Sequence, residues 1–190
     1  LEYDPPADRC EHLPATLGKL AAGGEVGLVV LGDSVANDAG CSPFDVLVER
    51  HWQGSRVLAS TSVYGGGNCR FYREEGNVRK FVLDYNPDVV VIGGISHGGD
   101  TEPIRDGVRQ IHDAGGIEVI CATGAPLPHR EDGPHRPPAW EGFGERLHAM
   151  CDEQGAEYLD LTTPYERYVE QSGKPPMYFL RDSHHANHRA

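Results

Sequence analysis

Five short apolar runs recur along the chain and constrain its fold more than any other feature. Each has the length of a strand and contains apolar side chains, and the first run, Val26 to Leu31, is typical of a strand buried on both faces of a sheet. The runs are Val26 to Leu31, Arg56 to Ser60, Asp88 to Ile92, Ile117 to Ala122 and Glu157 to Leu161. We therefore expect five strands of one sheet.

The segments between these runs carry the periodicity of helices. Apolar side chains recur at helical spacing in residues 78–85, 104–111 and 143–151, as they do on the buried stripe of a helix. Strands that alternate with helices are joined by crossover connections, which produce a parallel sheet with helices on both faces. The sequence thus predicts an α/β fold, a three-layer α/β/α sandwich.

The length of 190 residues suits one compact domain, so we expect a single domain over residues 1–190. Residues 1–25 form an N-terminal lead-in. Residues 125–138 form a proline-rich loop, which is either a wall of a substrate site or a rigid surface excursion. The net charge of −12 argues against nucleic acid or an anionic membrane as partner, because both attract clustered Lys and Arg.

A serine directly follows the first expected strand, in Gly32-Asp33-Ser34. A tight strand-to-helix turn there presents the hydroxyl at the carboxyl edge of the sheet, where ligands of such folds bind. The same tripeptide is also common as an ordinary turn and helix cap. Its position after the strand favours Ser34 as a nucleophile.

A histidine-rich segment near the end of the chain offers the partners that a serine nucleophile requires. His185 can take the proton of Ser34, and Asp182 can hold the imidazole in the correct tautomer. Two other interpretations stay open, a solvated tail and a metal held by His184 and His188 at i, i+4. We favour the triad and expect no metal.

Two glycine clusters follow two further strands. Residues 64–68 come after the second strand, and residues 93–98 come after the third. Glycine lets backbone N–H groups approach a ligand closely, as an oxyanion hole requires. Each cluster alone is equally typical of a tight turn.

Together these blocks resemble the GDSL/SGNH hydrolase superfamily over about residues 26–188. Gly32-Asp33-Ser34 matches the first conserved block, Gly67 or a neighbour the second, and Asp182 with His185 the last. The resemblance implies a flavodoxin-like sandwich with five parallel strands and a triad of Ser34, His185 and Asp182. It also implies an oxyanion hole made by the Ser34 N–H, the second-block glycine N–H and an asparagine of the third block.

The third block departs from the family pattern Gly-x-Asn-Asp, since this chain has Gly94-Ile95-Ser96-His97. The Ser96 hydroxyl and the Asn68 side chain are two candidates for the missing donor, and the sequence does not choose between them. Loss of one donor typically costs about 3 to 4 kcal/mol in the transition state. The departure marks either a rearranged hole or a weak enzyme.

The resemblance implies hydrolysis of a carboxylic ester through an acyl-enzyme, without metal or organic cofactor. We expect removal of acetyl groups from a carbohydrate, because no long apolar run suggests an acyl channel and aromatic strand-end loops suit a sugar. Those aromatic residues are Tyr64, Phe71, Tyr72 and Trp140; the expected substrate-binding residues are Asp33, Gly66, His97, His129 and Trp140. Two alternatives are a weak or inactive carbohydrate-binding module of this fold and a sugar O-acyltransferase.

The five cysteines form no Cys-x-x-Cys pair, so they do not predict a zinc site. Cys121 and Cys151 lie at apolar positions and are expected to be buried, whereas a disulfide between Cys41 and Cys69 stays open. The partner is expected to be a small-molecule or polysaccharide ester. The start at Leu1 suggests a processed or excised piece of a larger, multidomain chain. The acidic composition, the five cysteines and the expected polysaccharide substrate favour an exported bacterial protein over a cytoplasmic one.

Overall fold

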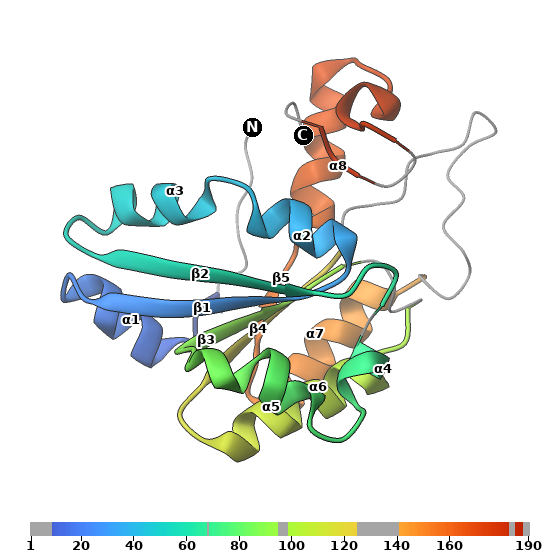
Figure 1. Ribbon diagram of the computed structural model, residues 1–190. Coiled ribbons are helices and arrows are strands. Elements are labelled where there is room, and N and C mark those ends of the chain that lie inside the picture. The colour runs from blue at the N-terminus through green and yellow to red at the C-terminus, as the bar shows by residue number, and fades with distance from the viewer. Residues whose placement is uncertain (1–8, 68, 95–98, 125–140, 183–184, 188–190) are drawn as a thin grey trace.

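A computed structural model of the chain describes residues 9–67, 69–94, 99–124, 141–182 and 185–187 (Figure 1). It confirms the predicted fold class. Five strands form one sheet in the order β2-β1-β3-β4-β5, and every pair of neighbours is parallel. The strands are β1 (Glu25–Gly32), β2 (Arg56–Val63), β3 (Val89–Ile92), β4 (Glu118–Ala122) and β5 (Glu157–Leu159).

Helices cover both faces of this sheet, so the three predicted layers are present (Figure 1). The α-helices are α1 (Pro14–Ala21), α2 (Ser34–Gly40), α3 (Phe44–His51), α4 (Cys69–Tyr72), α5 (Asn77–Phe81), α6 (Glu102–Ala114), α7 (Phe143–Gln154) and α8 (Thr162–Ser172). Two 3₁₀ turns, η1 (Leu83–Tyr85) and η3 (Pro176–Phe179), complete the described elements.

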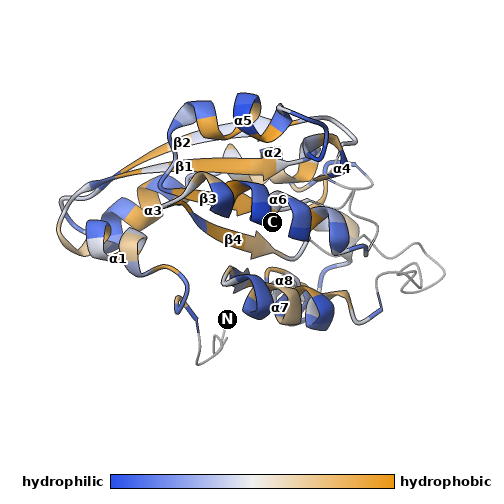
Figure 2. Ribbon diagram, turned by 90° about the horizontal axis from the view of Figure 1, so that it is seen from below, coloured by the Kyte–Doolittle hydropathy of each residue, from blue (hydrophilic) through white to orange (hydrophobic). Residues whose placement is uncertain are grey.

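The larger core lies between the sheet and helices α5, α6 and α7. A smaller core on the other face joins the sheet to α1 and α3. The predicted apolar stripes of α6 and α7 face the larger core, with Ile104, Val108, Ile111 and Leu147 almost fully buried. Figure 2 shows the same division, with largely hydrophobic strands and helices that carry hydrophilic residues outward.

Three elements differ from the sequence-based expectation. The expected helix at residues 78–85 divides into α5 and η1, because the backbone of Val82 leaves the helical region at φ −130°. β5 ends at Leu159 because the Asp160 carboxylate accepts the N–H groups of Thr162 (2.9 Å) and Thr163 (3.0 Å) and so starts α8. The lead-in contains α1, and the proline-rich loop lies outside the described residues.

Two carboxylates on the sheet hold the lead-in in place. Glu118 on β4 accepts the N–H groups of Ala15 (2.7 Å) and Thr16 (2.8 Å), which lack partners within the first turn of α1. The buried Glu157 carboxylate on β5 accepts the backbone N–H groups of Cys10 and His12. No signal in the sequence pattern distinguishes these two glutamates from surface ones.

All five cysteines are free thiols, so the possible Cys41–Cys69 disulfide does not form. Cys41 is exposed, whereas Cys69 is fully buried, and burial raises the pKa of its thiol to about 12. The expected burial of Cys121 and Cys151 is confirmed. Within the described segments, no helix combines the length and apolar character needed to cross a membrane.

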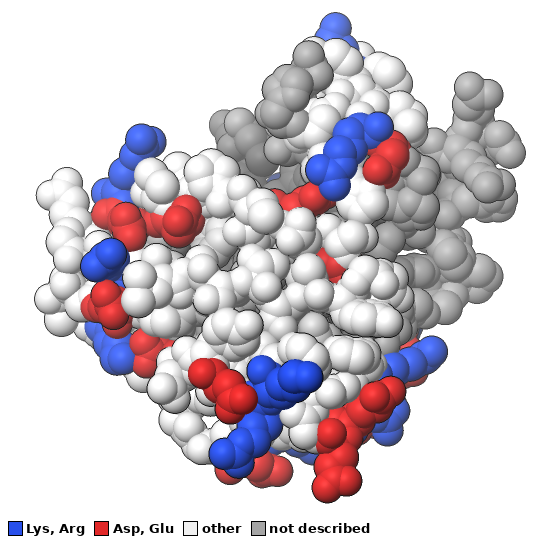
Figure 3. All heavy atoms as spheres, viewed as in Figure 1, with Lys and Arg blue, Asp and Glu red and all other residues white. Residues whose placement is uncertain are grey.

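Charged side chains are mixed on the face shown in Figure 3. Lys and Arg groups there lie beside Asp and Glu groups rather than in a continuous basic patch. The described residues also form ion pairs such as Lys19–Asp88 (2.6 Å) and Arg73–Asp106 (2.7 Å). The described surface of this face therefore offers no concentrated attraction for a polyanion.

Candidate active site

The nucleophile candidate stands where β1 meets α2, at the point where the sheet order reverses between β1 and β3. β1 ends at Gly32 and α2 begins at Ser34. A side chain at Gly32 has no room, because its Cβ would lie 2.3 Å from the Gly93 carbonyl oxygen after β3. The close approach of these two strand ends thus requires glycine and fixes the direction in which the chain enters α2.

Asp33 fixes the junction between β1 and the start of α2. Its carboxylate accepts the N–H groups of Val35 (2.9 Å) and Ala36 (3.4 Å), which caps α2. The side chain also packs against Gly94, where an added Cβ would lie 2.5 Å from Asp33 Oδ1. At 2% exposure, Asp33 is buried beside Ser34 and offers almost no surface to a substrate, which argues against its expected place among the substrate-binding residues.

The three triad candidates come together although 151 positions separate Ser34 from His185. His185 Nε2 lies 2.8 Å from Ser34 Oγ. On the other side of the ring, Nδ1 lies 2.7 Å and 2.9 Å from the two Asp182 carboxylate oxygens. A proton on Nδ1, held by Asp182, leaves Nε2 free to accept the hydroxyl proton of Ser34.

The Asp182–His185 turn is fixed by bonds within the terminal segment. The His185 N–H donates to Asp182 Oδ1 (2.9 Å), which sets the spacing of acid and base. Leu180 and Ala186 form an antiparallel bridge across the base of the turn. The Asn187 side-chain amide donates to the carbonyls of Tyr178 (2.9 Å) and Leu180 (3.0 Å) and so closes it.

Backbone donors suited to an oxyanion lie beside Ser34. Within the described residues, the N–H groups of Ser34, Gly65 and Gly66 have no hydrogen-bond partner. Gly67, the expected second-block donor, is occupied, because its N–H donates to the Tyr64 carbonyl (2.8 Å). The Tyr64 N–H donates to the last carbonyl of β1 (3.1 Å), which places this loop next to the nucleophile turn. The geometry therefore favours the neighbours of Gly67 as donors.

An exposed aromatic ring stands at the start of the same loop. Tyr64 is 54% exposed and stacks on Phe71, with ring centroids 4.5 Å apart and planes 6° apart. Phe71 in turn contacts Phe81 and Tyr72. Tyr72 itself is buried and donates its hydroxyl to the Ser62 carbonyl (2.9 Å), so it belongs to the core and is not available to a sugar.

Several candidates from the sequence lie outside the described residues. They are Asn68, Ser96, His97, His129, Trp140, His184 and His188. The third oxyanion donor and the proposed substrate contacts of this group stay predictions. In the described segments, no three ligating side chains gather in a way that could hold a metal ion.

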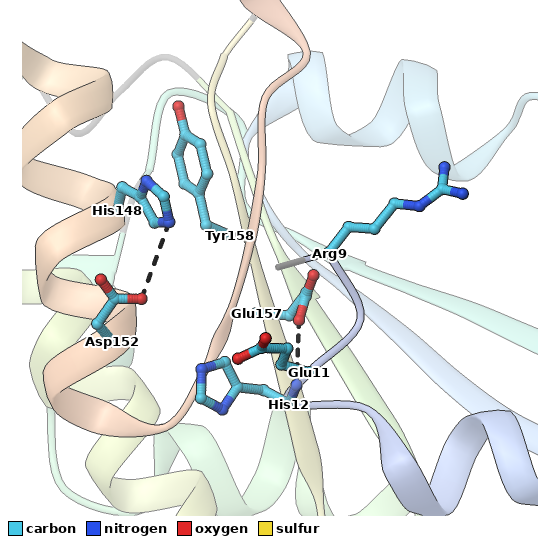
Figure 4. Close-up of a pocket in the computed structure, with 7 residues that line it drawn as sticks. All are labelled: Arg9, Glu11, His12, His148, Asp152, Glu157 and Tyr158. Carbon is cyan, nitrogen blue, oxygen red and sulfur yellow. Dashed lines mark hydrogen bonds and ion pairs between the residues drawn. The ribbon is translucent and has the colours of Figure 1, made fainter. Parts of the chain in front are cut away.

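A small pocket of about 30 Å³ lies elsewhere, at the β5 edge of the sheet (Figure 4). It is lined by Arg9, Glu11, His12, His148, Asp152, Glu157 and Tyr158. β5 is three strands away from β1, a separation of roughly 14 Å at the usual strand spacing. Because its central carboxylate, Glu157, is bonded to backbone N–H groups of the lead-in, we interpret this pocket as structural.

Solved structures of esterases share this fold. An acetyl xylan esterase aligns over 85% of this chain and 92% of its own, with a TM-score of 0.65 and 19% identity. A lipase/acylhydrolase from Enterococcus faecalis aligns over 86% and 88%, with a TM-score of 0.60 and 21% identity. A two-domain esterase active on acetylated mannans aligns over 94% of this chain but 48% of its own, with a TM-score of 0.70 and 11% identity.

No protein-family model and no curated protein matches the sequence. The structural likenesses also include a GDSL-like lipase from Bacteroides thetaiotaomicron at 14% identity and a TM-score of 0.56. At these identities they show a common fold. The fold that the resemblance to the GDSL/SGNH superfamily implies is therefore confirmed.

Proposed function

We propose that this protein is a serine ester hydrolase of the GDSL/SGNH type that works through Ser34, His185 and Asp182. The observation that carries the proposal is the continuous hydrogen-bonded row from Ser34 Oγ through the His185 ring to the Asp182 carboxylate. Those three groups, in that order and spacing, are what activation of a serine hydroxyl requires. The esterase and acylhydrolase structures with this fold support the same reaction class.

The geometry supports an acyl-enzyme mechanism. His185 Nε2 takes the Ser34 proton as Oγ attacks the ester carbonyl, and the free N–H groups of Ser34 and the Gly65–Gly66 turn hold the resulting oxyanion. The imidazolium then gives its proton to the leaving alcohol. Water, deprotonated by the same nitrogen, attacks the acyl-enzyme and releases the acid and Ser34.

For the substrate, we favour an acetyl ester on a carbohydrate. Two structures with this fold belong to an acetyl xylan esterase and an esterase active on acetylated mannans. The exposed Tyr64 ring, which stacks on Phe71, offers a face on which a sugar ring can stack. The aligned triad favours catalysis over the alternative of a binding module that has lost activity.

The test is covalent labelling of the purified protein with a fluorophosphonate, followed by intact mass and peptide mapping. We expect one adduct, on Ser34, together with hydrolysis of p-nitrophenyl acetate and release of acetate from acetylated xylan or mannan. Ser34→Ala should lose both labelling and turnover. Full esterase activity in Ser34→Ala would overturn the triad, and activity on p-nitrophenyl acetate without any on the polysaccharides would overturn only the substrate assignment.

A further inference from the structure

A second contact joins the terminal turn to the nucleophile helix. Arg181 Nη2 donates to Asp38 Oδ1 at 2.9 Å, and the two residues are 143 positions apart. Asp38 lies one helical turn after Ser34 on α2, and Arg181 directly precedes Asp182. Among the described residues, this ion pair and the Ser34–His185 bond are the side-chain hydrogen bonds that connect α2 with the terminal turn.

The terminal turn needs such a connection because burial anchors only the residue before it, Phe179, and not the triad acid itself. The Asp182 side chain is 49% exposed, and α8, which precedes the turn, has no buried residue. The Leu180–Ala186 bridge and the Asn187 bonds act within the terminal segment. These bonds fix the shape of the turn. The distance between the turn and α2 depends on other contacts.

The low exposure of Asp38 favours its pairing with Arg181. Its side chain is only 16% exposed, although it carries a charge. Its second oxygen, Oδ2, is buried without a hydrogen-bond partner in the described structure. A carboxylate that is so largely removed from water depends on its cation, so the pair resists separation more than an ion pair fully in solvent would.

Arg181 also lies close to the triad acid. Its Nε is 4.0 Å from Asp182 Oδ2, the oxygen that lies 2.7 Å from His185 Nδ1. An arginine released from Asp38 would be free to pair with Asp182 and to compete with His185 for the same oxygen. Asp38 therefore acts on the acid as well as on the position of the turn.

We propose that Arg181, held by Asp38, is a positioning residue that sets the distance between the Asp182–His185 turn and Ser34; this inference rests on the proposed function. It predicts a loss of turnover rather than of binding. A displacement of about 1 Å can lower a rate a hundredfold. We expect Arg181→Met to lower kcat roughly 10- to 100-fold while KM stays within roughly twofold.

The experiment compares Arg181→Met, Arg181→Lys, Asp38→Asn and the double variant Arg181→Met/Asp38→Asn on p-nitrophenyl acetate, with rates per folded protein. Lysine should restore part of the loss, because it keeps the charge but not the second nitrogen of the fork. The double variant should be no worse than the worse single variant, since both changes remove one contact. Hydrogen exchange should be faster at residues 180–187 in Arg181→Met but unchanged in β1.

The matched control is Arg56→Met, which breaks the exposed Arg56–Glu25 pair (3.8 Å) at the opposite edge of the sheet and should leave kcat and KM unchanged. A wild-type kcat in Arg181→Met, or additive losses in the double variant, would overturn the inference. So would a loss of rate that merely follows the folded fraction. If fluorophosphonate fails to label the wild-type protein, the proposed function fails instead, and the exchange data still decide whether Arg181 fixes the turn.

Discussion

Asp33 and Asp182 are carboxylates beside the nucleophile and the base, yet Asp33 is 2% exposed and the Asp182 side chain is 49% exposed. Asp33 accepts bonds from the start of α2 and packs against the end of β3, so the core of the protein holds it. Asp182 accepts bonds from His185, three residues away, within a turn outside the larger and smaller cores. The two halves of the site are therefore held by different means.

Because of this difference, substitutions on the two sides should affect different properties, stability on one side and activity on the other. A change on the nucleophile side disturbs the junction of β1, β3 and α2 and should lower the free energy of unfolding. A change in the terminal turn removes contacts that open locally without unfolding the sheet, so it should lower the rate while the global stability stays nearly constant.

The largest effect is expected from His185→Ala. Without a base the Ser34 hydroxyl stays protonated, and kcat/KM should fall at least about a thousandfold, or ~4 kcal/mol. The free energy of unfolding should change by less than about 1 kcal/mol, because the ring packs in no core. Esterase kinetics and urea unfolding measure the two quantities. His184→Ala is the control and should be much milder; the reverse order would assign the base to the wrong histidine.

On the nucleophile side, Gly94→Ala should cost mainly stability. Gly94 has φ +109°, and its added Cβ would lie 2.5 Å from Asp33 Oδ1. Strain and displacement of the buried cap should lower the free energy of unfolding by about 2 to 4 kcal/mol. Gly93→Ala is the matched control, since its Cβ would meet only Ala122 at 3.9 Å. Equal urea midpoints for the two variants would contradict a core-held nucleophile turn.

The nucleophile side was also the more predictable half. Ser34 follows a clear apolar strand, and its block has a fixed order relative to the glycine cluster and the Asp182–His185 block. The central strands β1, β3 and β4 were predictable for the same reason, because burial on both faces imposes a continuous apolar run. The sequence left open whether Gly67 or a neighbour is the second donor, and a single hydrogen bond favours the neighbours: the turn bond from Gly67 to Tyr64 leaves the N–H groups of Gly65 and Gly66 without a partner among the described residues.

The contacts that hold the terminal turn were not predicted. Asp38 and Arg181 are 143 residues apart and belong to no motif, so only the folded topology shows that they meet. Asn187 follows the last block closely, and asparagine is a common turn residue that bonds nearby backbone groups. An asparagine at this position is a signal for a turn held by side-chain hydrogen bonds, but it does not identify the carbonyls of Tyr178 and Leu180 as the acceptors.

A moderate effect is expected from Asn187→Ala. Removing both amide bonds should let the terminal turn open locally and lower kcat about tenfold, or ~1.4 kcal/mol, with less than about 1 kcal/mol lost in unfolding. Asn77→Ala is the matched control, because the Asn77 amide donates to the Phe71 carbonyl (2.7 Å) beside the core. It should lower stability by about 1 kcal/mol and leave kcat unchanged. The same profile in both variants would remove the distinction between the two regions.

The smallest effect is expected from Asp88→Asn, at the opposite edge of β1 and β3. Burial raises the pKa of Asp88, but hydrogen bonds from Lys19 Nζ (2.6 Å) and the Gly27 N–H (2.9 Å) outweigh it and lower the pKa below its ordinary 3.8. A lowered pKa stabilises the fold above the unfolded value, and this contribution is lost as the pH falls through the folded value. Asparagine should therefore cost under about 1 kcal/mol near pH 7 and progressively less near about pH 3, at unchanged kcat. Urea unfolding at both pH values measures this, and an equal deficit at each would show that the carboxylate's charge does not stabilise the strand edge.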